Sequence, residues 1–361
     1  MDEYSTNSNE PVRQKTPWFQ LHFMSSEFSF IQQIRHRAAQ PAADLVLGIG
    51  DDAAIMSERP GRERLITTDL LIEDVHFKLA YTPLHCLGHK ALAVSLSDIA
   101  AMGGKPEFAL LTLGIPRFQI SDLAWQSFFA GYFALAEKYG VALIGGDTSS
   151  APSKLVIDSI GLGSCAVGKA VRRSAAQVGD AIYVTGNLGA AATGLELLFR
   201  GERFDEAATN LQQSALRAHL MPEPRIAFGQ KIGGAGLAHA MMDVSDGLAQ
   251  DLAHICEESG VAAIIEFDAV PIADCVTLIT SVKEEAFSLA ISGGEDYELL
   301  FTASRQAEPA LFNFAAECEL NLTRIGEIIA PTASSKEPRL YLRREARVDL
   351  LKVKGYDHFH S

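Results

Sequence analysis

Acidic residues recur in six short turns along the chain, and these turns are the strongest candidates for chemistry. They are Gly50-Asp51-Asp52, Thr68-Asp69, Ser97-Asp98, Gly146-Asp147-Thr148, Asp243-Val244-Ser245-Asp246-Gly247 and Gly293-Gly294-Glu295-Asp296. Apolar residues flank each turn, which predicts partial burial, and a buried carboxylate without a nearby cation costs roughly several kcal/mol or becomes neutral. Several such groups together predict a divalent cation. Oxygen ligands of this kind favour Mg2+, held by few protein groups and completed by phosphate oxygens and water.

A simpler interpretation competes at each of these positions. An Asp after a Gly is more often a turn former or a helix cap than a metal ligand. Asp98 fits that explanation least, because residues 91–101 read as continuous helix around it. Asp246 fits it well, since it precedes a helix expected over residues 247–258, although capping and metal binding can coexist at one residue.

Motifs of other phosphate-binding and catalytic classes are missing from the sequence. It contains no GxxxxGK[ST] loop, no GxGxxG between a strand and a helix, and no convincing Ser/His/Asp or Cys/His nucleophile set. Transfer of a phosphoryl group onto an acceptor that is itself a phosphate needs no such nucleophile set, because the acceptor is already anionic. Such a reaction depends mainly on positioning and on neutralisation of charge. Arg172-Arg173 could pair with nucleotide phosphates, but such a dipeptide is more often an exposed basic pair, and His76 is by default a structural histidine.

The composition is that of an ordinary globular protein with an acidic balance. Of 361 residues, 48% are apolar and 21% are charged, and the formal net charge is −14. The sequence contains no run of Lys or Arg residues, and its net charge is negative. Both features argue against nucleic acids and anionic membranes as partners. Five widely spaced cysteines with no CxxC pair fit a reducing cytoplasm. We expect no membrane-spanning helix, and we expect residues 1–24, which lack signal- and transit-peptide features, to form a flexible tail.

Alternating helical and strand patterns must position the acidic turns. The length favours two domains, residues 25–167 and 168–361, joined within the Gly- and Arg-rich residues 163–179. The alternation predicts an α/β (α+β) fold, in which most acidic turns directly follow a strand. Single helices are expected at 27–37, 84–102, 121–139, 188–199, 247–258, 284–291 and 307–317, and more than one helix near 212–232. Strands are expected at 45–49, 64–70, 108–114, 141–144, 154–165, 180–185, 238–242, 261–267, 297–303 and 322–329.

The motifs, taken in chain order, resemble those of the thiamine-monophosphate kinase family over residues 27–360. The resemblance rests on Gly48-Ile49-Gly50-Asp51-Asp52, Thr67-Thr68-Asp69, Gly88-His89-Lys90-Ala91-Leu92-Ala93, Ser97-Asp98-Ile99-Ala100-Ala101-Met102-Gly103, Gly145-Gly146-Asp147-Thr148, Arg173-Ser174, Asp243-Val244-Ser245-Asp246-Gly247, Gly293-Gly294-Glu295-Asp296-Tyr297-Glu298-Leu299 and Gly355-Tyr356-Asp357. It implies a two-domain aminoimidazole-ribotide synthetase-like fold. The N-terminal domain would bind ATP and Mg2+ and would pair with a second copy into a shared barrel, so that a homodimer holds ATP near its interface. The implied reaction is direct transfer of the ATP γ-phosphate to thiamine monophosphate.

The same resemblance assigns roles to individual residues. The implied magnesium ligands are Asp52, Thr67, Thr68, Asp69, Asp98, Asp147, Asp243 and Asp246. The implied nucleotide contacts are Gly145, Gly146, Arg173 and Ser245, with either Phe128 or Phe129 as an aromatic contact. The implied contacts to thiamine phosphate are His76, Glu295 and Tyr356, whose aromatic ring would stack on a thiamine ring.

Two alternatives stay open at this stage. Another member of the superfamily, such as aminoimidazole-ribotide synthetase or selenophosphate synthetase, would carry similar acidic turns. The second of these would need a reactive Cys or selenocysteine near the N-terminus, and residues 1–50 contain no Cys. A non-catalytic cation-binding protein would also carry such turns, but this alternative gives Arg173 and His76 no role that links them to the acidic turns.

Overall fold

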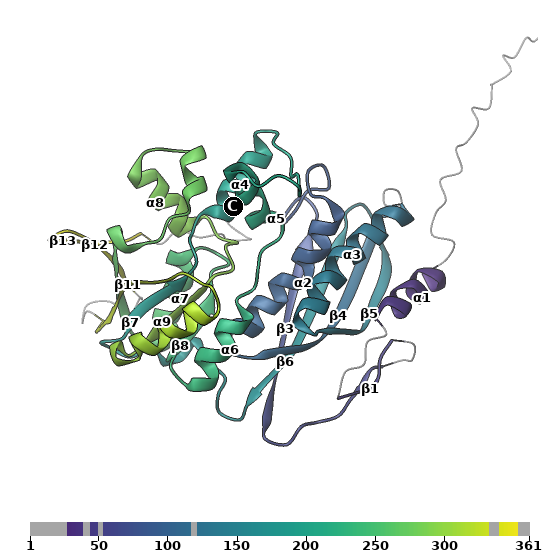
Figure 1. Cartoon of the computed structure of the whole chain (residues 1–361), viewed down its shortest axis with the longest axis horizontal. Coiled ribbons are helices and arrows are strands. Elements are labelled where there is room, and N and C mark those ends of the chain that lie inside the picture. Colours follow the sequence, from purple (N-terminus) through teal and green to yellow (C-terminus); the bar gives the residue numbers. More distant parts are fainter. Residues whose placement is uncertain (1–26, 39–43, 50–52, 117–120, 332–338, 353–361) are drawn as a thin grey trace, which may run out of the picture.

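The computed structural model describes residues 27–38, 44–49, 53–116, 121–331 and 339–352 of the chain. These residues form two large sheets, each with its own helices, which meet along helix α2 (Leu84–Ala101), and a small two-stranded sheet (Figure 1). The flexible tail predicted for residues 1–24 lies outside the described residues. None of the helices in the described ranges is long and apolar enough to cross a membrane.

The first half of the chain builds a four-stranded sheet with two long helices on one face. In spatial order its strands are β3 (Arg62–Ile72), β6 (Val156–Ala166), β4 (Lys105–Pro116) and β5 (Ala142–Ala151), with β4 and β5 parallel and the other pairs antiparallel. The face is covered by α2 and α3 (Asp122–Tyr139), while α1 (Glu27–Ala38) lies beside β5 (Figure 1). A hairpin of β1 (Leu45–Leu47) and β2 (Ile55–Met56) packs on part of the other face. Within the described ranges this sheet does not close into a barrel.

The second half builds a seven-stranded mixed sheet. In spatial order its strands are β13 (Arg347–Leu350), β12 (Leu340–Arg344), β9 (Ala262–Glu266), β11 (Leu322–Ile329), β7 (Ala181–Thr185), β10 (Leu299–Ala303) and β8 (Ala240–Asp243). Its helices are α4 (Ala190–Phe199), α5 (Leu211–Leu220), α6 (Ile226–Ala235), α7 (Leu248–Ser259), α8 (Lys283–Ser292) and α9 (Glu308–Glu317). The α/β (α+β) class is therefore confirmed. The β12–β13 hairpin and the short 3-10 helices, of which Asp274–Leu278 is the longest, were not predicted from the sequence.

Two strands run further than predicted, and this moves one of the acidic residues. Asp69 lies inside β3, within the residues 64–70 predicted as a strand, whereas Asp147 lies inside β5 rather than after a strand that ends at residue 144, so the expectation was wrong for Asp147. β3 continues because its residues pair with β6 along its whole length, and these hydrogen bonds outweigh the weak strand preference of Asp. β5 passes through Gly146, where a Cβ would lie 1.9 Å from the Leu111 carbonyl oxygen, so only glycine fits. Asp243 does end a strand, β8, as predicted.

Helix α2 is the element that both halves share. It is buried on nearly all sides because it packs against α3, β6, α6 and β8, which is typical of a helix that is apolar all round. One hydrophobic core runs from Trp125 in α3 through Leu92 in α2 to Phe228 in α6 and Phe301 in β10. The few polar side chains of α2 are therefore held at fixed positions between the two halves.

Candidate active site

The alternation of side chains along β3 separates residues that the sequence grouped in one metal site. Thr67 lies on the face covered by α2, where its hydroxyl donates a short hydrogen bond to Asp98. Asp69 shares that face, since neighbouring strand residues alternate between faces. Thr68 lies on the opposite face and donates to Asp158 Oδ1 at 2.6 Å. Six of the predicted magnesium ligands therefore fall into two groups, while Asp246 lies in the loop after β8.

The first group, which we call the inner cluster, consists of Thr67, Asp69, Asp98 and Asp243. Asp243 accepts a hydrogen bond from Ser97 Oγ at 2.6 Å, while Asp69 Oδ2 is buried with no hydrogen-bond partner among the described residues. Burial and the charges of Asp98 and Asp243 raise the pKa of Asp69 to about 7, and burial and Asp98 raise the pKa of Asp243 to about 7. Mutual repulsion and an unpartnered oxygen are features that a bound cation would relieve.

The inner cluster fits a magnesium ion only as a partial site. Within the described ranges, no three Asp, Glu, His or Cys side chains come close enough to hold a metal ion by themselves. Asp52, which the resemblance adds to the set, lies outside the described residues. Because Mg2+ commonly keeps several waters and takes further ligands from substrate phosphates, two or three protein oxygens are sufficient.

A pocket of about 520 Å³ opens beside the inner cluster. Thr67 and Asp98 line it together with Arg172 and Arg173 from the connection between the two halves. Burial raises the pKa of Asp98, and the charge of Arg173 opposes this rise. The pocket thus combines carboxylates, which suit a cation, with guanidinium groups, which suit phosphate oxygens.

Asp251, which was not predicted from the sequence, holds the loop after β8 in place. Asp251, in α7, is fully buried, and its Oδ2 accepts from the backbone N–H groups of Ser245, Asp246 and Gly247 at 3.1, 3.2 and 3.2 Å. Asp246 does not cap α7, whose N-cap is Gly247 with no side-chain hydrogen bond, so the capping alternative was wrong. An acid in the first turn of the predicted helix was the signal that could have revealed Asp251.

The second group lies on the outer face of the first sheet, and we call Thr68, Asp147 and Asp158 the outer row. Thr112 of β4 pairs with Asp147 of β5 on one side and with Asp158 of β6 on the other. Since neighbouring strands are about 4.8 Å apart, the two carboxylates stand roughly 10 Å apart. Nothing in the sequence motifs indicated Asp158. The register of the strands is what brings it beside Thr68.

The predicted nucleotide contacts are distributed over separate places. Arg173 lines the 520 Å³ pocket, and Ser245 lies in the loop held by Asp251. Gly145 and Gly146 instead line a pocket of about 90 Å³ between β5 and α1. The single chain therefore does not bring the four residues into one site.

The two candidate aromatic contacts differ in accessibility. Phe128 is fully buried between Trp125 and Tyr132, and its surroundings leave no room for a nucleotide. Phe129 is 5% exposed and lines a small pocket of about 30 Å³ beside Ile34 of α1. Phe129 is therefore the better placed of the two.

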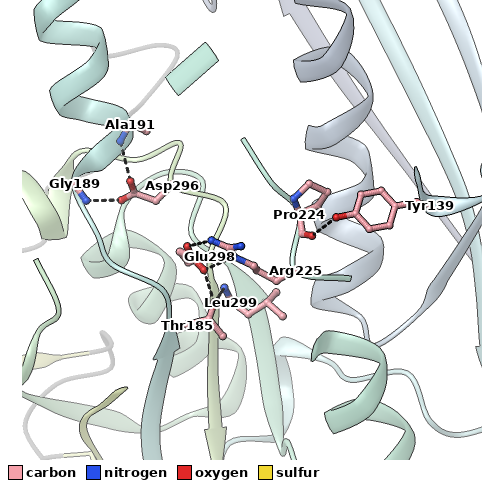
Figure 2. Close-up of polar contacts among 9 residues, drawn as sticks. All are labelled: Tyr139, Thr185, Gly189, Ala191, Pro224, Arg225, Asp296, Glu298 and Leu299. Atoms are coloured by element: carbon pink, nitrogen blue, oxygen red, sulfur yellow. Dashed lines mark hydrogen bonds and ion pairs between the residues drawn. The ribbon is translucent and has the colours of Figure 1, made fainter. Parts of the chain in front are cut away.

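The acidic residues of the 293–298 loop have partners within the chain. Figure 2 shows Asp296 beside the N-terminus of α4, where its carboxylate accepts hydrogen bonds from the N–H groups of Gly189 at 2.8 Å and Ala191 at 3.1 Å. Glu298 forms an ion pair with Arg225 and accepts from Thr185 Oγ1 at 2.6 Å. Burial raises the pKa of Asp296 to about 7, although both amides oppose the rise. These two acids anchor the loop.

The three predicted contacts to thiamine phosphate have different outcomes. Glu295 Oε1 lies 2.7 Å from Lys90 Nζ and its Oε2 lies 3.0 Å from His219 Nδ1, so both oxygens face groups of the protein. His76 lies in the turn after β3, and its Nδ1 accepts from the Ile72 N–H at 3.0 Å. Tyr356 lies outside the described residues.

Comparisons of the sequence with known proteins cover both halves. Residues 50–170 match the family described as AIR synthase related protein, N-terminal domain, and residues 177–335 match AIR synthase related protein, C-terminal domain. Thiamine-monophosphate kinase of Bacillus subtilis (strain 168) is 37% identical over 341 residues, which is 92% of this chain and 99% of that protein. Thiamine-monophosphate kinase of Escherichia coli (strain K12) is 37% identical over 334 residues, 92% of this chain and 98% of that protein.

Solved structures share the fold over the same extent. Thiamine-monophosphate kinase from Stenotrophomonas maltophilia K279a superposes with a TM-score of 0.78 at 38% identity, over 89% of this chain and 98% of that chain. AaThiL complexed with AMPPCP and TMP superposes with a TM-score of 0.70 at 29% identity, over 92% of this chain and 97% of that chain. The likeness therefore extends over nearly the whole chain.

Proposed function

Because the chain belongs to the thiamine-monophosphate kinase family, we propose that it transfers the γ-phosphoryl group of ATP to thiamine monophosphate, giving thiamine diphosphate and ADP. An oxygen of the acceptor phosphate forms the new bond to the γ-phosphorus, and the bond from that phosphorus to the β–γ bridging oxygen breaks. The observation that carries this proposal is the 520 Å³ pocket, where Thr67 and Asp98 of the inner cluster lie together with Arg173. The ligands AMPPCP and TMP of AaThiL support it.

The residues placed to hold Mg2+ are those of the inner cluster. Asp69, Asp98 and Asp243 supply carboxylate oxygens, and Thr67 supplies a hydroxyl whose proton is already donated to Asp98. Bound there, Mg2+ would neutralise the charge of the phosphates and fix the position of their oxygens. Arg173 adds a positive charge to the same pocket, where it binds phosphate oxygens. With an anionic acceptor, the chain needs no general base.

The remaining residues of the family pattern complete the proposed site. We assign Asp52, Thr68, Asp147 and Asp246 to further magnesium ions, Gly145, Gly146 and Ser245 to the nucleotide, and His76, Glu295 and Tyr356 to thiamine monophosphate. Five free cysteines are consistent with a cytoplasmic enzyme.

We also propose a homodimer that joins the outer faces of two four-stranded sheets. That face exposes large apolar side chains, with Ile66 at 69% and Leu70 at 49%, beside the outer row. Exposed apolar side chains on one face of a sheet are typical of an interface. Pairing two such sheets would bury them and would form the barrel implied by the family pattern.

The proposed function is tested by incubating purified protein with ATP and thiamine monophosphate, with and without Mg2+, and separating the products by chromatography. The expected result is thiamine diphosphate and ADP in equal amounts, formed only with Mg2+. A matched Asp98→Asn protein should form neither. ADP release that requires formylglycinamidine ribotide instead would move the chain to its purine-synthesis relatives.

A further inference from the structure

A buried ion pair connects helix α2 to the second half of the chain. Lys90 of α2 is 2% exposed, and its Nζ lies 2.7 Å from Glu295 Oε1 and donates to the His219 carbonyl at 3.2 Å. His219, in the last turn of α5, is 3% exposed, and its Nδ1 lies 3.0 Å from Glu295 Oε2. Three elements that are distant in sequence therefore meet at one carboxylate.

The charges of this group balance inside the protein. Burial by itself would raise the pKa of Glu295, but the charge of Lys90 and the imidazole of His219 hold this pKa well below its usual value. Burial and the Lys90 ammonium lower the pKa of His219, which keeps its ring neutral. The group thus consists of one ammonium and one carboxylate. Removal of Glu295 leaves the buried Lys90 without a counter-charge, and removal of Lys90 leaves Glu295, whose side chain is 28% exposed, without its ion-pair partner.

Glu295 belongs to a loop whose backbone needs support. Glu295 and Tyr297 have φ angles of 57° and 50°, in the left-handed region that non-glycine residues seldom adopt. The loop is tied to the segment after β8 by hydrogen bonds from Glu295 N to Ser245 O at 2.8 Å, Tyr297 N to Val244 O at 2.9 Å and Val244 N to Glu298 O at 2.8 Å. The position of Glu295 therefore fixes the segment that carries Asp243 and Asp246.

Helix α2 makes a second contact with that segment on the same side. Ser97 follows Lys90 by seven residues, or about two helical turns, so both side chains project from one face of α2. Ser97 Oγ donates to Asp243 Oδ2 at 2.6 Å, and Asp98 is the next residue. The two contacts hold the carboxylates of the second half against the helix that carries Asp98.

We propose that Lys90 is a positioning residue, whose pairing with Glu295 clamps the 293–298 loop and the 243–246 segment onto α2 so that Asp243 and Asp246 stand at a fixed distance from Asp98. This inference rests on the proposed function, because it assigns the carboxylates to phosphoryl transfer. The clamp itself is a property of the fold and is measurable without substrate.

The test compares Lys90→Met with Lys231→Met, which removes the ammonium of an exposed pair with Glu317. We expect Lys90→Met to lower kcat at least ~10-fold, with the KM for ATP within about threefold of wild type, because misplacement by about 1 Å costs up to ~100-fold. Lys231→Met should match wild type. Lys90→Gln, which keeps a donor N–H, should recover part of kcat and serves where the Met variant does not fold.

Hydrogen exchange supplies a readout that does not depend on the reaction. Peptides covering residues 240–248 and 292–299 should exchange about tenfold faster in the Lys90 variants and at the wild-type rate in Lys231→Met. A wild-type protein without kinase activity would overturn the proposed function and leave exchange to decide on the clamp. Unchanged exchange, a kcat within twofold of wild type, or a change confined to the KM for thiamine monophosphate would each overturn the positioning role.

Discussion

The carboxylates of the inner cluster and those of the 293–298 loop share a chain and similar apolar surroundings but differ in their partners. Asp296 and Glu298 face backbone N–H groups, a hydroxyl and a guanidinium. Asp69 and Asp243 lie beside other carboxylates; Asp243 accepts one hydrogen bond, from Ser97 Oγ, and Asp69 Oδ2 has no hydrogen-bond partner among the described residues. Acids that the protein itself satisfies hold the fold together, whereas acids that repel one another favour a ligand that is bound from solution.

Because of this difference, removing a carboxylate should lower the free energy of unfolding in the 293–298 loop but not in the inner cluster. In the 293–298 loop, a substitution leaves donors without an acceptor, which destabilises the protein. In the inner cluster, a substitution removes repulsion, so stability is kept while function is lost. Stability and activity measured together therefore separate the two kinds of acid.

The largest change in stability is expected for Glu298→Ala. Arg225, whose side chain is 22% exposed, would lose its ion-pair partner and keep only the weaker attraction of Glu223, and Thr185 Oγ1 would lose its acceptor, which together cost about 3 kcal/mol in the free energy of unfolding. Urea denaturation measures this directly. Glu317→Ala, which breaks the exposed pair with Lys231, should leave the same quantity close to its wild-type value, because solvent screens an exposed pair. Equal losses in the two variants would contradict the structural role of Glu298.

Asp98→Asn should show the opposite pattern. It removes one ligand charge from the inner cluster at nearly constant volume, so kcat/KM should fall at least ~100-fold. The free energy of unfolding without Mg2+ should equal or exceed that of wild type, because Asp69 and Asp243 lose a repelling neighbour. Added Mg2+ should raise the melting temperature of wild type more than that of the variant. Turnover near the wild-type rate would exclude Asp98 as a ligand.

Asp251→Ala should fall between these two cases. The N–H groups of Ser245, Asp246 and Gly247 would lose their acceptor, which costs about 1–3 kcal/mol in the free energy of unfolding. Because the loop carries proposed nucleotide and metal ligands, the KM for ATP should also rise. Asp251→Asn keeps one acceptor oxygen and serves as the control. A stable Ala variant with unchanged KM would show that the loop does not depend on Asp251.

Much of the architecture could be predicted from the sequence, because the spacing of apolar residues and the residues that end helices are signals within a short stretch of chain. The helices α2, α3 and α7 were predicted within a residue or two, since their apolar spacing and terminal glycines are continuous along the chain. The extents of β3 and β5 were not, because strand length is decided by pairing with β6 and β4. Such pairing involves residues far away in the sequence.

The candidate site was predicted only as a set of residue types. The motifs indicated Asp69, Asp98 and Asp243, but they could not show that Thr67 and Thr68 point to opposite faces of β3. They also could not distinguish Glu295 and Asp296 as acids with partners from acids without them. Asp158 and Asp251 were missed for the same reason, since each acts through a contact that only the folded chain creates.

The smallest effect is expected for Asp296→Asn, which tests how much of the anchoring depends on charge. Asn keeps an oxygen that can accept from the Gly189 N–H, while the second hydrogen bond, to the Ala191 N–H, is lost. The free energy of unfolding should fall by about 1 kcal/mol, as for other losses at a helix N-terminus. Thermal denaturation with and without substrates measures the change. If Asp296→Asn instead lost activity as completely as Asp98→Asn, with stability unchanged, Asp296 would belong with the inner cluster, and partners seen within the chain would no longer distinguish the two kinds of acid.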